Sequence, residues 1–142
     1  MLEQTKQQMA SLRLNGMLMA LEEQLNGPPV ELSFEERLGI LVSREHCERE
    51  NQRLKNRLKR AKLKPGTLEQ IDYFAHRGLN KQKILNFNGS SWIQHHRNVL
   101  ITGPTGTGKT FLACALAHKA CLLGFSVQYY RLLHLIHDLT LA

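Results

Sequence analysis

Apolar residues recur at helical intervals through the first 26 residues of the chain. The positions with this spacing are Leu2, Met9, Leu12, Met17, Leu21 and Leu25. Gly16 lowers the helix propensity in the middle of the run, and Asn26-Gly27-Pro28-Pro29 ends it. The pattern predicts either one helix or two short helices separated near Gly16.

A second, longer helix is predicted to begin at Ser33. Ser33-Phe34-Glu35-Glu36 has the form of a capping box, with Ser33 as N-cap and Glu36 three positions later. The apolar stripe that we expect to be buried behind it contains Phe34, Leu38, Leu41 and Val42. The helix is expected to reach about Leu63, because Pro65-Gly66 then stops it. Residues 1–64 are therefore predicted to form a small helical domain, and residues 65–97 a linker with short helices.

The pattern changes after residue 97. Residues 98–102 are apolar and β-branched, as in a buried strand, and residues 109–123 read as a helix that ends at Gly124. A second strand is predicted over residues 125–130 and an amphipathic helix over residues 132–141. The expected fold class is α/β, with a helical domain followed by the first part of a parallel-sheet nucleotide-binding domain at residues 98–142.

A complete phosphate-binding P-loop joins the first predicted strand to its helix. The motif G-x-x-x-x-G-K-[ST] is matched by Gly103, Pro104, Thr105, Gly106, Thr107, Gly108, Lys109 and Thr110. Its glycines allow successive backbone N–H groups to face an anion, and the helix N-terminus adds partial positive charge. Lys109 is expected to reach the β- and γ-phosphates, and the Thr110 hydroxyl to hold Mg²⁺. The motif thus predicts binding of ATP with Mg²⁺.

Hydrolysis needs a further carboxylate that holds the metal from a second strand. After Gly103 the only acidic residue is Asp138, which lies in the predicted helix at residues 132–141. Two predicted strands are also too few for a parallel sheet covered on both faces. We therefore expect an incomplete nucleotide-binding domain without turnover of its own. An intact small protein that binds nucleotide without catalysis is the alternative.

Charge is distributed unevenly along the chain, whose net charge is +7. Residues 1–50 carry nine acids against five Lys and Arg, whereas residues 51–64 carry no acid. The cations of this basic block are Arg53, Lys55, Arg57, Lys59, Arg60, Lys62 and Lys64. We expect the block to contact the phosphate backbone of DNA without reading bases. The alternative is a solvated helix end that complements the C-terminal dipole.

Other chemistry is weakly indicated. Cys114, His118 and Cys121 have the spacing of one helix face, but a zinc site needs a fourth ligand, so we expect core packing and no metal there. Three cysteines without a disulfide framework, no leader sequence and an apolar run too short for a bilayer suit the reducing cytoplasm and predict no membrane partner. Tyr73 or Phe74 is expected either to stack on the nucleotide base or, as we favour, to fill core.

With its P-loop behind a helical, basic N-terminus, the chain resembles the IstB family of transposition helper ATPases. These proteins are related to the DnaC helicase loaders within the AAA+ class. The resemblance rests on an ordered series of segments across the chain: residues 12–17, 32–36, 49–53, 67–73 and 98–113.

The resemblance implies ATP-dependent DNA binding, target-site selection, stimulation of a transposase and assembly into homo-oligomers. It also implies later catalytic motifs, the Walker B acid, the sensor residues and the arginine finger, which we do not find here. Two alternatives remain open. One is a replicative helicase loader of the same fold, and the other is a non-enzymatic interaction fragment that uses only its helices.

Overall fold

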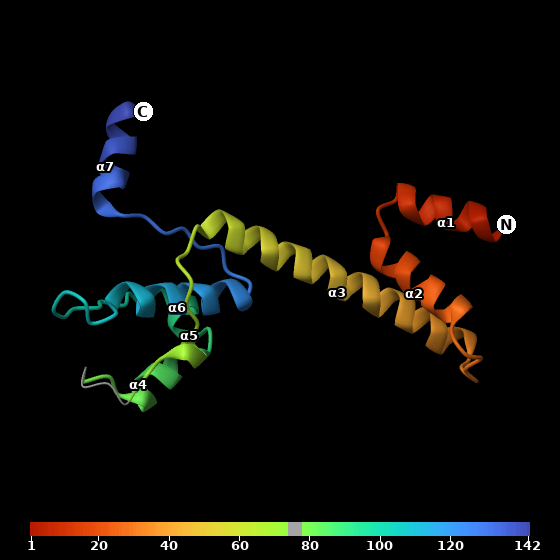
Figure 1. Cartoon of the computed structure of the whole chain (residues 1–142), viewed down its shortest axis with the longest axis horizontal. Coiled ribbons are helices and arrows are strands. Elements are labelled where there is room, and N and C mark those ends of the chain that lie inside the picture. Colours follow the sequence, from red (N-terminus) through yellow and green to blue (C-terminus); the bar gives the residue numbers. More distant parts are fainter. Residues whose placement is uncertain (74–77) are drawn as a thin grey trace. The chain divides into compact units, whose positions relative to one another are not determined.

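The computed structural model of the chain describes residues 1–73 and 78–142 (Figure 1). The chain divides into two compact units, residues 1–53 and residues 54–142. The boundary falls within the long helix α3 (Phe34–Ala61), so each unit contains one part of that helix.

Unit 1 consists of α1 (Leu2–Ser11), α2 (Asn15–Asn26) and the first part of α3. Of the two alternatives, the structure has two short helices: α1 ends at Ser11 and α2 begins at Asn15, and the break, where Arg13 takes a left-handed φ of 56°, comes before Gly16. Gly16 itself has a different role from the one its low helix propensity suggests. A Cβ at this position would lie 2.8 Å from the backbone of both Arg44 and Glu45, so only glycine allows α2 to approach α3 this closely.

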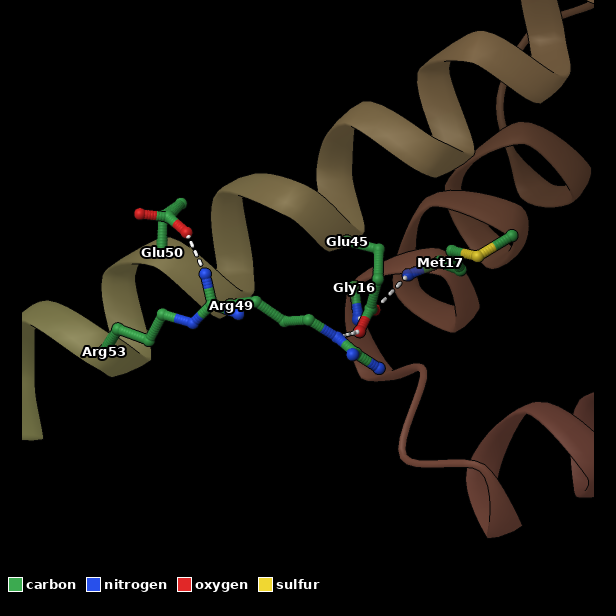
Figure 2. A network of polar contacts seen from close by, with 6 residues as sticks. All are labelled: Gly16, Met17, Glu45, Arg49, Glu50 and Arg53. Carbon is green, nitrogen blue, oxygen red and sulfur yellow. Dashed lines mark hydrogen bonds and ion pairs between the residues drawn. The ribbon is translucent and has the colours of Figure 1, made fainter.

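A buried carboxylate fixes the contact between α2 and α3. Glu45, 8% exposed, accepts hydrogen bonds from the backbone N–H groups of Gly16 (2.8 Å) and Met17 (3.2 Å) at the start of α2 (Figure 2). Arg49, one turn later on α3, donates to the other oxygen of Glu45 at 2.7 Å. The Arg49 hydrogen bond and those from Met17 and Gly16 hold the pKa of Glu45 below its ordinary value, against the opposing effect of burial.

The predicted start of α3 is confirmed in detail. The Ser33 N–H donates to the Glu36 carboxylate at 2.7 Å, and the Glu36 N–H donates to the Ser33 hydroxyl at 3.2 Å, which is a complete capping box. The predicted apolar stripe is only partly right, because Leu41 is buried but Phe34, Leu38 and Val42 are exposed. The stripe is wider than the face of α3 that α2 covers.

Unit 2 contains the end of α3 and a series of short helices around α6. The elements after α3 are η1 (Leu68–Gln70), α4 (Lys81–Leu85), η2 (Asn86–Asn88), α5 (Ser91–Gln94), α6 (Lys109–Leu122) and α7 (Leu132–Leu141). The core forms where one face of α6 meets η1 and α4. Its buried members are Leu68, Ile71, Ile84, Leu112, Ala115 and Leu116. Core packing therefore holds in place the helix that directly follows the P-loop.

The prediction of an α/β fold with a parallel sheet is wrong for the part of the chain that the structure describes. Residues 98–102 and 125–130, the two predicted strands, have no regular secondary structure and belong to no β-ladder. The first still alternates as a strand does: Val99 and Ile101 pack against the core while Leu100 is 90% exposed. Local pattern favours the extended conformation, but a sheet also requires a hydrogen-bonded neighbour along each strand, and neither segment has one among the described residues.

The predicted helices at residues 109–123 and 132–141 are confirmed by α6 and α7. Asp138 consequently lies on a helix and not at the end of a strand. None of the helices in the described ranges is both long and apolar enough to cross a bilayer.

Candidate functional site

The P-loop, residues 103–110, joins residues 98–102 to the N-terminus of α6 (Figure 1). Two of its glycines take left-handed φ values, 81° at Gly106 and 92° at Gly108, a region that L side chains seldom enter. Gly108 is the N-cap of α6 and turns the chain into the helix. The glycines in the motif are thus required by the backbone path and not only by the sequence pattern.

The Lys109 side chain folds back across the loop. Its ammonium donates to the carbonyl oxygens of Gly103 at 2.6 Å and Pro104 at 2.7 Å, and the Thr107 hydroxyl also donates to Pro104 at 2.7 Å. An ammonium has three donors, so one N–H of Lys109 remains for a ligand. These contacts hold the positive charge of Lys109 against the loop backbone.

Backbone N–H groups are a second kind of donor in the P-loop. The N–H groups of Gly106, Gly108, Lys109 and Thr110 donate no hydrogen bond within the described residues. The first N–H groups of a helix have no intrahelical partner, and the helix dipole makes their surroundings favourable to anions. The loop therefore combines unpaired N–H donors, a fixed ammonium and a helix N-terminus, which together suit a polyphosphate.

The surroundings of the loop limit what chemistry it supports. A small cavity of about 80 Å³ next to it is lined by loop residues together with Leu79, Ile101 and Leu112, and no carboxylate among the described residues lines it. Thr110 is exposed at the start of α6, where its hydroxyl is available to a metal ion carried by a nucleotide. The loop residues thus fit a nucleotide–Mg²⁺ complex, but they bring no acid to hold the metal from the protein side.

Two further predictions concern residues outside the loop sequence, namely Tyr73 or Phe74 and the cysteines of α6. Tyr73 packs against the core and has the Lys81 ammonium 5.8 Å from its ring centre, which supports the core interpretation; Phe74 lies outside the described residues. Cys114 and Cys121 are buried in α6. No group of three His, Cys, Asp or Glu side chains in the described ranges is arranged to hold a metal ion.

The structure divides the basic block into paired and free cations. Arg53 forms an ion pair with Glu50 at 2.6 Å (Figure 2), and the Arg57 Nε donates to the carbonyl oxygen of Cys121, near the end of α6, at 3.1 Å. The remaining cations are exposed and form no ion pair with any described residue: Lys55, Lys59, Arg60, Lys62 and Lys64. Five of the seven cations that were predicted to contact DNA are therefore available for such contacts.

A groove beside the basic block was not foreseen from the sequence. It has a volume of about 490 Å³ and is lined by Arg57 and Arg60 of α3 and by Ser126, Val127 and Gln128 from the segment 125–130. No motif marks residues 126–128, because their proximity to α3 arises only when the chain folds.

Comparison with known proteins gives consistent matches. A family model described as IstB-like ATP binding protein matches residues 7–142. The insertion sequence IS1162 putative ATP-binding protein of Pseudomonas fluorescens is 44% identical over 100% of this chain and 63% of its own length. A putative insertion sequence ATP-binding protein of Sinorhizobium fredii is 41% identical over 97% of this chain and 57% of its own. The insertion sequence IS21 putative ATP-binding protein of Pseudomonas aeruginosa is 34% identical over 79% of this chain and 43% of its own length. The chain thus spans between about two fifths and two thirds of the length of these relatives.

Proposed function

The chain belongs to the family of IstB-like ATP-binding proteins, and we propose that it binds ATP with Mg²⁺ as a helper in the transposition of an insertion sequence. The observation that carries the proposal is that the P-loop holds both the Lys109 ammonium and several N–H groups without a partner among the described residues. The relatives' names, which refer to insertion sequences, favour this role over helicase loading.

We assign the residues of the P-loop to parts of the nucleotide. The N–H groups of Gly106, Gly108 and Lys109 would donate to the β-phosphate, and the free N–H of the Lys109 ammonium to the β- and γ-phosphates. The Thr110 hydroxyl would bind Mg²⁺, which neutralises phosphate charge. The affinity then depends on the terminal phosphates more than on the base.

DNA is the second ligand that we propose. The five exposed, unpaired cations at the end of α3 and just beyond it would bind backbone phosphates without base specificity. A transposase and further copies of the same protein are the partners proposed from family membership. The DNA proposal is independent of the nucleotide proposal, because it depends on different residues.

We also propose that this chain does not turn ATP over by itself. The acids of unit 2 are Glu69, Asp72 and Asp138, and none of them lines the cavity at the P-loop. Without a carboxylate beside Mg²⁺ or an acid that orients water, the main sources of catalysis in this class are missing. Release of inorganic phosphate above the level of a Lys109→Ala variant would contradict this point.

The nucleotide proposal is tested by the thermal stability of the chain in the presence of different nucleotides. A ligand that binds only the folded state raises the unfolding free energy by about 2.7 kcal/mol at a hundredfold excess over Kd. ATP–Mg²⁺ at millimolar concentration is expected to raise the Tm, whereas AMP at the same concentration is expected to leave it unchanged. Equal effects of ATP and AMP, or no effect of ATP, would contradict the assignment.

A further inference from the structure

The groove between the end of α3 and residues 125–130 is built by two specific contacts within unit 2. The Tyr129 N–H donates to the carbonyl oxygen of Ala61 at 3.1 Å, which ties residues 125–130 to the end of α3. The Arg57 Nε donates to the Cys121 carbonyl at 3.1 Å, which fixes that guanidinium from the other side. The groove walls are therefore held by hydrogen bonds and are not a chance gap between loops.

The charged side chains that line the groove are the guanidinium groups of Arg57 and Arg60. Arg57 uses one of its five N–H donors on Cys121, and Arg60 is exposed and forms no ion pair with any described residue. The backbone N–H groups of Ser126, Val127 and Gln128 donate no hydrogen bond in the part of the chain that the structure describes.

The groove also lacks competing negative charge. Residues 54–142 contain thirteen Lys and Arg but only three acids, and none of the acids lines the groove. The side-chain oxygen of Gln128 already accepts a hydrogen bond from the Tyr130 hydroxyl, and the amide NH₂ keeps two N–H donors. An anion with several acceptor oxygens is the ligand chemistry that such a lining favours.

We propose that this groove binds a phosphodiester of the DNA backbone, with Arg60 and Ser126 contacting the phosphate and Arg57 positioned by Cys121 as a second guanidinium. The inference rests on the DNA binding proposed above and extends it to residues 125–130, outside the basic block. DNA is favoured over a free phosphate because the groove lies open beside the exposed cations, which supply neighbouring phosphates with partners.

The inference separates cations that are equivalent in the sequence. Arg60 lines the groove, whereas its neighbour Lys59 on the same helix is also exposed, also forms no ion pair with any described residue, and lies outside the groove. A diffuse positive surface would use both cations alike. A phosphate that binds in the groove requires Arg60 more than Lys59.

The test measures binding of a fluorescein-labelled DNA duplex to the full chain by anisotropy, at several salt concentrations. Ser126→Glu places a carboxylate in the groove, and Ser91→Glu makes the same charge change at an exposed position of α5 outside it. We expect Ser126→Glu to weaken binding by about tenfold or more and Ser91→Glu by less than about twofold. Arg60→Gln should weaken binding several-fold more than Lys59→Gln. Far-UV circular dichroism checks that each variant is folded.

The outcomes distinguish this inference from the DNA proposal on which it rests. Failure of the unaltered chain to bind the duplex would overturn both. Binding by the unaltered chain with equal effects of Ser126→Glu and Ser91→Glu would overturn the groove alone. Inorganic phosphate is the further probe: if it binds in a Ser126-dependent way while DNA binding ignores Ser126, the groove takes free phosphate and the inference is wrong.

Discussion

The two units of this chain use their charged groups in opposite ways. Unit 1, residues 1–53, has nine acids against six Lys and Arg, whereas unit 2, residues 54–142, has three acids against thirteen. In unit 1 the buried carboxylate of Glu45 accepts hydrogen bonds from two backbone N–H groups at the start of α2 and forms an ion pair with Arg49. In unit 2 the N–H groups of the P-loop glycines Gly106 and Gly108 and of residues 126–128 have no partner among the described residues.

This difference separates groups that stabilise the fold from groups that are available to a ligand. A buried, paired carboxylate is costly to disturb, because removal of either partner leaves an uncompensated group. Exposed cations without partners contribute little to stability and remain free for an anion. Substitutions of polar groups in unit 1 should therefore change stability, and those in unit 2 should change binding.

The largest effect is expected from neutralising the free cations of unit 2. Replacing Lys55, Lys59, Arg60, Lys62 and Lys64 together with Gln should weaken duplex binding by about 1000-fold near 0.1 M salt, because each bound phosphate releases a counterion. The slope of log affinity against log salt should flatten by about one unit for each phosphate that the variant no longer binds. Arg53→Gln, which removes a cation already paired with Glu50, is the control and should change the slope little. An unchanged slope in the fivefold variant would show that the block is only a solvated helix end.

The next largest effect is expected at the P-loop. Lys109→Ala should weaken binding of a fluorescent ATP analogue by about 10- to 100-fold, since a hydrogen bond to a charged group contributes about 1.5–3 kcal/mol. Lys83→Ala removes an exposed cation from α4 and should leave the affinity within about twofold. Comparable decreases in both variants would mean that ATP responds to overall charge and not to the loop.

A smaller effect, on stability alone, is expected at the helix contact in unit 1. Gly16→Ala should lower the free energy of unfolding by about 1–3 kcal/mol, because the new Cβ would meet the α3 backbone at 2.8 Å. Gly39→Ala, on α3 with no atom within 4 Å of its Cβ, should instead raise it by about 0.5–1 kcal/mol through helix propensity. Urea unfolding followed by circular dichroism measures both. We expect the two substitutions to change the free energy of unfolding in opposite directions. A change in the same direction would refute the close contact at Gly16.

The smallest effect is a pH dependence of unit 1. The pKa of Glu45 lies below its ordinary value of 4.5, so the folded state favours the carboxylate. Its contribution to stability should be complete above pH 4.5 and should disappear as the pH falls through the lower folded pKa. The stability difference between the chain and its Glu45→Gln variant should therefore shrink on acidification, while Glu48→Gln, at an exposed position of α3, should show no such trend. A difference that stays constant down to about pH 3 would contradict the role of Glu45.

Local sequence signals predicted the local features of this molecule. The capping box at Ser33 and Glu36, the helix that follows the P-loop, and the helix rather than strand at residues 132–141 are all present. Each of these features depends on hydrogen bonds or side-chain periodicity within a few residues, and this is the range over which sequence patterns carry information.

Features that depend on distant residues were missed. The parallel sheet is absent from the described residues because strand propensity does not supply a partner strand. Phe34 is exposed because burial of a position on α3 depends on which other elements pack against that helix. The Glu45 contact with Gly16 joins residues 29 positions apart, and residues 126–128 reach the basic block only through the fold. At the P-loop, the motif identified the residues, whereas the Lys109 contacts with the loop carbonyls required the structure.

The central claim is that the unpaired N–H groups of the P-loop form a binding site for polyphosphate. It is tested most directly by the backbone amide resonances of Gly106, Gly108, Lys109 and Thr110, followed by NMR while a non-hydrolysable ATP analogue with Mg²⁺ is added. We expect these four resonances to shift in a saturable way, and those of Gly16 and Gly39 in unit 1 to stay in place. P-loop resonances that remain unchanged at millimolar analogue would contradict the claim.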